Sequence, residues 1–358
     1  MELRFRQIHL DFHTCEHLPD IGNHFDAEEF ADTLQAAGVD SITCFARCHH
    51  GWLYYPSKRY PEKIHPQLKN QNLLPEMIEA CHRRGIRVPI YITVQWDEQI
   101  RREHADWRVM DANGKVGDGP YTDSFYQDLC VNSPYRDYLK DITDEILQTM
   151  PVDGLFFDIV SPRDCSCRYC LETMAQQGID AYDPMQRQAF AQQTIDAFKL
   201  DMSAFIREQN QDCSIFYNGS HINPSIRSSL SAYTHFELES LPSGSWGYLH
   251  FPLVMRYART LGLDCLAHTG KFHTEWGDFH SFKNREALEY ECFHMLALGA
   301  KCLIGDQLEP CGKLSQPVYE LIGSVYHQVQ QKEPWCSGAN AVTEIGVLAP
   351  RGFYSGSH

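Results

Sequence analysis

The segment Val152-Asp153-Gly154-Leu155-Phe156-Phe157-Asp158 is the starting point for working out the architecture of this chain. Its apolar middle predicts a fully buried strand, and Asp158 stands where that strand would emerge into solvent. In a barrel of alternating strands and helices, chemistry collects at the C-terminal ends of the strands. A carboxylate at that point is well placed to act as a nucleophile or a general acid/base. The alternative is an aspartate that caps the next helix or turn.

Short apolar strands alternate with amphipathic helices about eight times along the chain. Several predicted helices end at a glycine that leads into a predicted strand, which is typical of αβ loops; these glycines are Gly38, Gly85, Gly262 and Gly299. The pattern predicts an α/β fold, a parallel (β/α)8 TIM-like barrel. An open doubly wound sheet is the rival, and the lack of a glycine-rich phosphate loop after the first strand weakens it. The strands are expected at residues 8–12, 39–46, 86–94, 154–160, 214–218, 233–239, 265–268 and 301–304.

The character of the chain changes after Trp335. We expect a catalytic barrel over residues 1–335, a linker over residues 336–341, and the start of a further α/β domain over residues 342–358. Ser337-Gly338-Ala339-Asn340 is typical of a linker, and Ile345–Pro350 predicts an opening strand. The chain stops before that element could pack, so we expect it to be the front part of a longer protein.

The composition narrows the classes of function. A net charge of −16 argues against a nucleic-acid surface, and an aromatic content of 12% suits stacking against sugar rings. The N-terminus lacks the apolar core of a signal peptide, and no stretch is apolar for long enough to cross a membrane. We therefore expect a cytoplasmic protein without a membrane or nucleic-acid partner, whose fourteen cysteines do not form a disulfide framework.

Polar side chains follow nearly every predicted strand, and these strand ends would meet on one rim. Glycosidic bond cleavage needs two carboxylates, and the candidates are Asp158, Glu237, Glu239 and Glu275. Arg47 and Asp97 are also expected on this rim. The side chains expected to bind sugar hydroxyls or stack on the ring are His13, His49, His50, Trp52, Tyr91, Trp96, Asn218, Trp246, His268, Lys271 and Trp276. The rim predicts a glycosidase that uses no cofactor for catalysis.

The same motifs resemble a known family. Cys48-His49-His50-Gly51-Trp52 resembles the His-His-Asp-Gly-Phe motif of glycoside hydrolase family 29, the retaining α-L-fucosidases, although the aspartate is missing. Gly154–Asp158 is similar to the Gly-Leu-Trp-Phe-Asp nucleophile strand of that family. Ser245-Trp246-Gly247-Tyr248 resembles its Ser-Trp-Gly-Tyr segment. This resemblance covers roughly Gln7–Tyr248.

The whole chain more closely resembles glycoside hydrolase family 151, the hypothetical glycosyl hydrolase 6 group. That group joins a fucosidase-like barrel to a trimerisation domain of the β-galactosidase type, so the resemblance implies a trimer that acts on an oligosaccharide or glycoside. It implies that Asp158 is the nucleophile and that Glu239, rather than Glu237 or Glu275, is the favoured acid/base. It also implies that His13, His49 and His50 contact sugar hydroxyls.

A cysteine cluster forms a separate signal. Cys165, Cys167 and Cys170 follow the fourth predicted strand, and Cys130 is the expected fourth member. Four soft ligands would form a closed, structural zinc site, and the run resembles the zinc cluster of glycoside hydrolase family 42 β-galactosidases. The alternative is a set of reduced thiols without metal.

Three other functions stay open at this point. The first is a β-galactosidase-like glycosidase on the same scaffold. The second is a metal-dependent amidohydrolase, whose candidate ligands are His9, Asp11, His13, His221, His268 and Asp306. The third is a non-catalytic sugar-binding relative, which would bind ligand without turnover.

Overall fold

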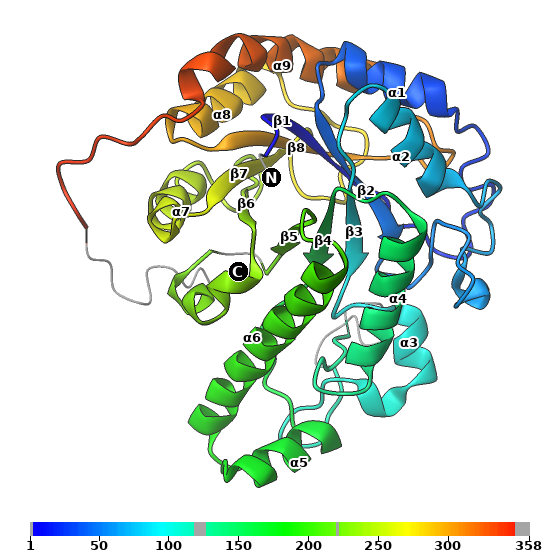
Figure 1. Ribbon diagram of the computed structural model, residues 1–358, viewed down its shortest axis with the longest axis vertical. Coiled ribbons are helices and arrows are strands. Elements are labelled where there is room, and N and C mark those ends of the chain that lie inside the picture. The colour runs from blue at the N-terminus through cyan, green and yellow to red at the C-terminus, as the bar shows by residue number, and fades with distance from the viewer. Residues whose placement is uncertain (1–2, 118–126, 220–221, 348–358) are drawn as a thin grey trace.

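A computed structural model describes residues 3–117, 127–219 and 222–347 of the chain. Eight parallel strands curl into a barrel (Figure 1), in the order β5-β4-β3-β2-β1-β8-β7-β6. Their bounds are β1 Arg6–Asp11, β2 Ser41–Arg47, β3 Pro89–Thr93, β4 Gly154–Asp158, β5 Ser214–Tyr217, β6 His235–Glu239, β7 Asp264–Gly270 and β8 Lys301–Gln307. The predicted (β/α)8 TIM-like barrel is confirmed.

Helices surround the strands and follow the predicted alternation. Their bounds are α1 Ala27–Ala36, α2 Leu73–Arg83, α3 Glu98–Glu103, α4 Tyr135–Thr149, α5 Arg168–Gln177, α6 Pro184–Gln209, α7 His250–Ala258, α8 Arg285–Ala297 and α9 Gln316–Cys336. Short 3-10 helices lie at Pro61–Lys63, Ala105–Trp107, Pro224–Ala232 and Arg259–Leu261. Figure 1 shows α5 and the adjoining end of α6 projecting away from the barrel. The two helices α3 and α5 were not predicted from the sequence.

The strands are almost wholly buried, as parallel strands covered by helices are, although β1, β6 and β8 also carry charged side chains. Leu3, Leu266 and Leu303 form a small apolar cluster apart from the main core. Between β2 and β3, the rings of Phe45 and Tyr91 stack with centroids 3.7 Å apart. The interior of the barrel is therefore a packed core that supports the strand ends.

The contact between β5 and β6 differs from the paired contacts between the other neighbouring strands of the barrel. No ladder joins these two strands in the described part of the chain. Near their N-terminal ends, the backbone N–H of Thr234 donates to the carbonyl of Ile215 at 3.1 Å. Further along, a cavity of about 60 Å³ lies between the strands and is lined by residues of both, including Asn218 and Glu239. This gap, termed the β5–β6 seam, lies beside the C-terminal ends of the strands.

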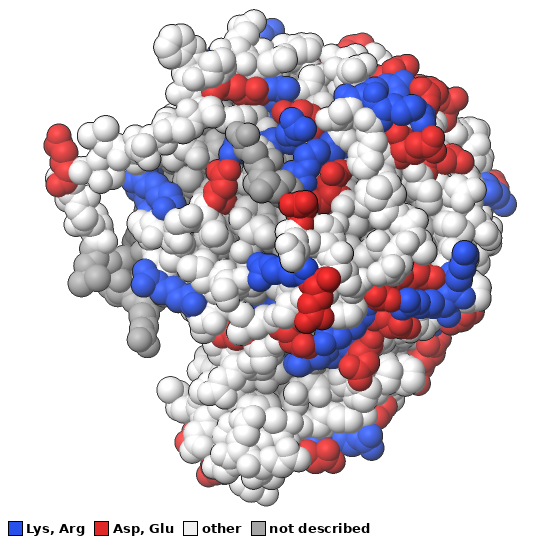
Figure 2. All heavy atoms as spheres, viewed as in Figure 1, with Lys and Arg blue, Asp and Glu red and all other residues white. Residues whose placement is uncertain are grey.

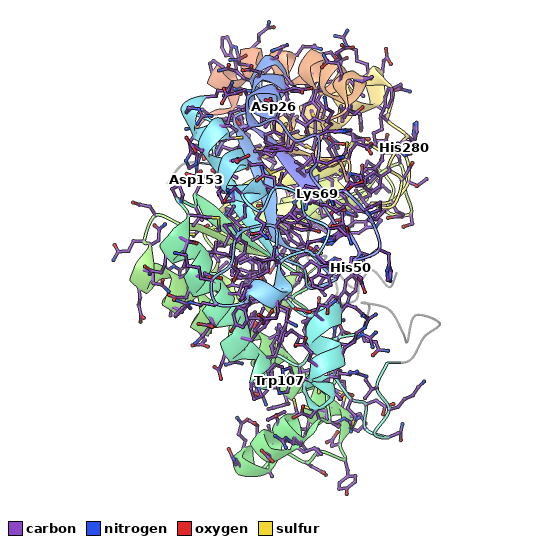
Figure 3. All side chains as sticks on the ribbon, turned by 90° about the vertical axis from the view of Figure 1, so that its right-hand side faces the viewer. Asp26, His50, Lys69, Trp107, Asp153 and His280 are labelled. Atoms are coloured by element: carbon purple, nitrogen blue, oxygen red, sulfur yellow. The ribbon has the colours of Figure 1, made fainter. Side chains whose placement is uncertain are left out.

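The two ends of the barrel lie on opposite sides of the molecule. Figure 3 shows Asp153, which precedes β4, on one side and His50 and His280, which follow β2 and β7, on the other. Because catalysis in such barrels belongs to the C-terminal ends of the strands, the site is sought on the side of His50 and His280. On the face shown in Figure 2, acidic and basic side chains are intermixed.

The C-terminal residues leave the barrel after α9. Residues 337–347 form neither helix nor strand, and the side chains of Val342, Ile345 and Val347 are exposed. Residues 348–358, the rest of the predicted further domain, lie outside the described residues, so the domain boundaries stay a prediction. In the described part of the chain, helices that combine the length and the apolar character of a membrane span are absent.

Candidate active site

Asp158 lies at the C-terminal end of β4, as predicted, and fixed donors surround its carboxylate. Oδ2 accepts a hydrogen bond from the Tyr91 hydroxyl at 2.5 Å. Oδ1 accepts from the backbone N–H of Ile159 at 2.8 Å and from Asn218 Nδ2 at 2.9 Å. Burial raises the pKa of Asp158 above its ordinary value, while the hydrogen bond from Tyr91 opposes that rise. The donors hold the carboxylate in one orientation.

The residue after Asp158 has an unusual backbone. Ile159 has a φ of +57°, and a β-branched residue in this left-handed region is a genuine outlier. Such strain costs about 1–3 kcal/mol and gathers at functional sites. In this chain the turn directs the N–H of Ile159 toward the Asp158 carboxylate, so the strained turn helps to hold it.

Glu239 lies at the C-terminal end of β6, across the β5–β6 seam from Asp158. Its Oε1 accepts from the indole N–H of Trp276 at 2.8 Å, and its Oε2 accepts from Asn218 Nδ2 at 3.1 Å. Burial raises the pKa of Glu239 to about 7, and the neighbouring charge of Asp158 adds to the rise. A carboxyl group with this pKa is protonated for much of the time near neutral pH, as a general acid must be.

One amide nitrogen joins the two carboxyl groups. Asn218 Nδ2 lies 2.9 Å from Asp158 Oδ1 and 3.1 Å from Glu239 Oε2. These two oxygens therefore lie no more than about 6 Å apart. Retaining glycosidases separate their carboxyl groups by about 5–5.5 Å and inverting ones by about 6.5–9.5 Å. The separation here fits the retaining geometry.

The other two candidate carboxylates lie elsewhere. Glu237 is buried two residues before Glu239 on β6, and its Oε1 lies 2.9 Å from His235 Nε2. Glu275 lies on an exposed part of the loop after β7, where Ser245 donates to it at 3.2 Å. Among the four predicted candidates, Asp158 and Glu239 are the two that the structure brings together through Asn218.

His13 and His49 lie against each other beside Asp158. Their rings stack with centroids 3.9 Å apart, and His49 Nε2 is 3.8 Å from Asp158 Oδ2. His13 Nδ1 accepts from the backbone N–H of His49 at 3.1 Å, so its proton is on Nε2, which faces Asp11 Oδ1 at 3.0 Å. Thr93 donates its hydroxyl proton to the Trp96 carbonyl, so it accepts from His49 Nδ1 at 2.8 Å. Both histidines are thereby fixed in one tautomer.

Sequence reasoning found this histidine pair but considered Asp11 only as a metal ligand and gave Thr93 no role in holding the histidines. Asp11 shares a strand face with His13, because residues two apart on a strand point the same way. Thr93 shares a face with Tyr91 for the same reason. This period-two pattern is the signal that identifies Asp11 and Thr93 as partners of the rim residues.

The aromatic residues predicted near the second and third strands divide into two groups. The Trp96 ring lies 4.9 Å from the His49 ring, and its indole N–H donates to Asp128 at 3.0 Å. Trp52 instead packs edge-on against His65, with centroids 5.8 Å apart. His50 is half-buried, and burial lowers its pKa to about 4. Trp96 thus contacts the histidine pair that lies beside Asp158.

The remaining predicted sugar-binding residues lie around the ends of β6 to β8. His268 is buried beside Trp276, with ring centroids 5.3 Å apart. The Lys271 ammonium donates to backbone carbonyls of the loop after β7, at Phe279 and Ser281. Trp246 packs against His250, at 4.7 Å between centroids. Lys271 therefore fastens the loop that carries Trp276.

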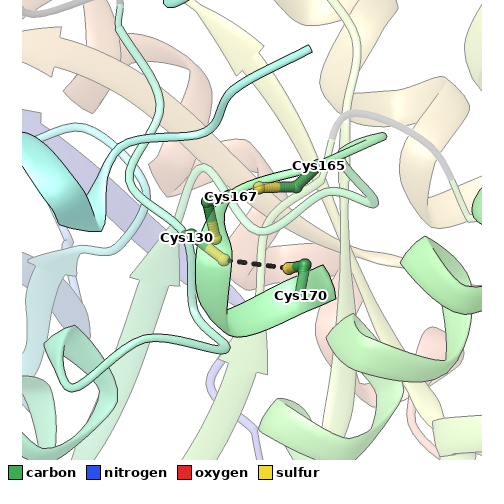
Figure 4. Close-up of side chains that lie close together, drawn as sticks. All are labelled: Cys130, Cys165, Cys167 and Cys170. Carbon is green, nitrogen blue, oxygen red and sulfur yellow. Dashed lines mark hydrogen bonds between the residues drawn. The ribbon is translucent and has the colours of Figure 1, made fainter. Parts of the chain in front are cut away.

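The four predicted cysteines converge beside the barrel (Figure 4). Cys130, Cys165, Cys167 and Cys170 are all buried, and their sulfur atoms lie within 4.8 Å of one another. Zinc–sulfur bonds of about 2.3 Å in a tetrahedron place the sulfurs about 3.8 Å apart, and Cys130 Sγ and Cys170 Sγ are 3.5 Å apart. The donor set and its spacing fit a structural zinc ion.

The ligands of the amidohydrolase alternative do not form such a group. Among residues 3–117, 127–219 and 222–347, the cysteine cluster is the one set of three or more potential ligands close enough to share an ion. Asp306 lies near Lys271, at 3.9 Å, while His9 packs against Phe156. His221 lies outside the described residues. The described histidines and aspartates thus give this alternative no metal site.

Comparisons with known proteins show which family and which solved structures the chain resembles. Residues 26–159 match the family described as hypothetical glycosyl hydrolase 6. The structure of α-L-fucosidase isoenzyme 2 from Paenibacillus thiaminolyticus is 42% identical, with a TM-score of 0.88 over 94% of this chain and 51% of that one. The chain thus spans about half the length of that relative. A search of curated proteins found no match.

More distant structures share the fold alone. α-L-Fucosidase isoenzyme 1 from Paenibacillus thiaminolyticus is 16% identical, with a TM-score of 0.58 over 95% of this chain and 76% of that one. The β-galactosidase from Marinomonas ef1 is 10% identical, with a TM-score of 0.66 over 92% of this chain and 60% of that one. These distant structures support the barrel fold, while the family match over residues 26–159 and the 42% identical structure confirm the predicted resemblance to the hypothetical glycosyl hydrolase 6 group.

Proposed function

We propose that the protein is a retaining, exo-acting α-L-fucosidase with Asp158 as nucleophile and Glu239 as general acid/base. The observation that carries the proposal is the Asn218 amide, which lies within hydrogen-bond distance of both carboxylates. The similarity to the α-L-fucosidase of Paenibacillus thiaminolyticus supports the choice of sugar.

The mechanism follows from the two protonation states. Asp158 attacks the anomeric carbon, and the bond to the leaving oxygen breaks as Glu239 gives that oxygen its proton. Glu239, now ionised, takes a proton from water, and the resulting hydroxide displaces Asp158 from the sugar. The donors around Asp158 stabilise its charge before attack and again after release. His49 is positioned beside Asp158 to contact a sugar hydroxyl.

Further proposals concern the cysteine cluster, the assembly of the protein and its class of substrate. We infer that the cysteine cluster holds a structural zinc ion, which would fasten the segment after β4 to the loop that carries Cys130 and take no part in the reaction. The trimer that the sequence resemblance implies stays a proposal, as does action on an oligosaccharide or other glycoside.

Glu239→Gln tests the acid/base assignment. We expect turnover of methyl α-L-fucoside, whose leaving group needs a proton, to fall about 1,000-fold, because general acid catalysis contributes about 100- to 10,000-fold. Turnover of dinitrophenyl α-L-fucoside, whose leaving group needs none, should fall far less in the first step. The measurement is release of the leaving group in the first step, methanol or dinitrophenolate, with β-D-galactosides as competing substrates.

Two matched variants sharpen this experiment. Glu237→Gln and Glu275→Gln change the other two candidates and should not show the difference between the two leaving groups. If the enzyme cleaved galactosides and not fucosides, the proposed sugar would be wrong, but the assignment of Glu239 as acid/base would stand. Equal losses on both fucosides in Glu239→Gln would refute the general-acid role.

The pH profile provides an independent prediction. Glu239 must be protonated, so kcat/KM on methyl α-L-fucoside should stay high below its pKa of about 7 and fall as the pH rises through that value. Asp158 must be ionised, so the acidic limb follows its pKa, which burial raises. Initial rates between pH 4 and 10 give both limbs, and a profile that is flat through about pH 7 would contradict the assignment.

A further inference from the structure

The slot that holds Trp276 is formed by a glycine inside β8. Gly305 lies opposite His9 of β1 and Gly270 of β7 in the strand register. A Cβ added to Gly305 would lie 2.4 Å from Trp276 Cη2 and 2.9 Å from Cζ3. Real Cβ atoms do not come this close to another carbon, so the indole occupies space that any side chain at 305 would take. Glycine within a strand often marks such a close approach.

The indole in this slot is fixed on its other sides. Its ring lies 5.3 Å from His9 and 5.3 Å from His268, and 5.0 Å from Phe272, measured between centroids. Gln307, two residues after Gly305, donates to the Trp276 carbonyl at 2.7 Å. With this packing, the indole N–H lies 2.8 Å from Glu239 Oε1. Trp276 therefore contacts the acid/base directly.

We propose that Gly305 is a positioning residue for the acid/base: its missing side chain opens the slot that directs the Trp276 N–H at Glu239. This inference rests on the proposed function, because it assigns a partner to the proposed acid/base. It differs from the sequence-based expectation for Trp276, which was stacking against the sugar.

The geometry defines what a methyl group at 305 does. β8 is paired on both sides, so the indole has to move by about 1 Å to restore an ordinary carbon–carbon contact. Moving the indole by that amount lengthens its 2.8 Å hydrogen bond beyond the usual range. The ionised form of Glu239 loses a donor, and its protonated form becomes favoured over a wider pH range.

The added Cβ would also lie 3.0 Å from His268 Nε2, so His268 has to give by a few tenths of an ångström, which is less than the indole has to move. The titratable groups that face Glu239 include Asp158 of β4 and Asp11 of β1. His268 of β7, which lies opposite Glu239 in the strand register, is a third. The charges of Asp158 and Asp11 already favour the protonated form, and burial keeps His268 neutral by lowering its pKa well below the ordinary value. A shift in the pH profile of the variant therefore reports on the indole.

The test is a double-mutant cycle of Gly305→Ala and Trp276→Phe, measured as kcat/KM on methyl α-L-fucoside against pH. Loss of one hydrogen bond to a charged group corresponds to about one pKa unit. We expect each single variant to move the basic limb upward by about one unit, with kcat in Gly305→Ala lowered about tenfold. The phenyl ring of Trp276→Phe leaves room for a methyl group, so Gly305→Ala should cause no further shift in that background. Gly277→Ala, beside Trp276 and with no atom within 4 Å of the added Cβ, is the control.

Each outcome of this double-mutant cycle either supports the role of Gly305 or overturns it. A Gly305→Ala profile that matches the wild type, or a shift that adds to that of Trp276→Phe, overturns the proposal. If Gly305→Ala alone does not fold but the double variant does, the clash is with the indole and the proposal stands. If the double variant also fails to fold, the strand itself needs glycine and the proposal is wrong. Glu239→Gln, measured in parallel, distinguishes failure of the Gly305 proposal from failure of the proposed function. If Glu239→Gln keeps its turnover of methyl α-L-fucoside, the acid/base assignment itself is wrong.

Discussion

Asp158→Ala should lower kcat on dinitrophenyl α-L-fucoside by about 10,000-fold or more, because losing the attacking group of a covalent mechanism typically costs at least that much. The substitution removes the carboxylate that Tyr91, Ile159 and Asn218 hold in place. It leaves a space in which a small anion can attack. Added azide should restore part of the turnover and form β-L-fucosyl azide, in which a C–N bond replaces the bond to the leaving group.

The matched variant is Asp158→Asn, which removes the nucleophile but fills the space. We expect it to be as inactive as the alanine variant and not to respond to azide. Thermal unfolding of both variants checks that the barrel is intact. Residual turnover in Asp158→Ala above about one-hundredth of the wild type, or an azide product with the α configuration, would rule out the nucleophile assignment.

Removal of the proposed zinc ion should have the largest effect on stability. Structural zinc contributes an apparent binding free energy of about 10–16 kcal/mol in small domains. If only about 3–5 kcal/mol of this stabilises the barrel, Cys167→Ser lowers the Tm by about 10 °C. Elemental analysis should find one zinc ion per wild-type chain and less than one in the variant. A strong chelator should produce the same fall in Tm with the wild type.

Cys213→Ser provides the control, because Cys213 is also buried but lies outside the cluster. It should retain the zinc. Kinetic constants of Cys167→Ser measured well below its Tm should stay close to those of the wild type, because the cluster holds structure and no reacting atom. If elemental analysis found no zinc in the wild type and Cys167→Ser left the Tm unchanged, the cluster would be a set of reduced thiols and the zinc proposal would be wrong.

The strand ends explain why much of the site was predictable. Asp158 and Asn218 each follow an apolar run, Glu239 ends an alternating strand, and the parallel barrel topology brings the C-terminal ends of these strands to one rim. The sequence pattern alone therefore indicated which residues come together. It could not show that Asn218 contacts both carboxylates, because that depends on how β5 and β6 approach each other.

Residues whose role depends on loop paths were not predictable. Arg47 and Asp97 stand at strand ends and were expected on the rim. They instead form a fully buried ion pair at 2.8 Å, in which Asp97 also accepts from the Ile100 N–H and begins α3. Trp276 reaches Glu239 from the loop after β7, and tertiary contacts fix that path. Short helices such as α3 depend on the same contacts and lack a long apolar period.

The β5–β6 seam affects how this barrel could change during evolution. In the described part of the chain, no backbone ladder spans the seam, and near the C-terminal ends of the strands the Asn218 amide bridges Asp158 and Glu239. A shorter residue at position 218 removes that link without disturbing any strand. The spacing that separates retention from inversion of anomeric configuration is therefore open to change by single substitutions, while the fold around it stays the same.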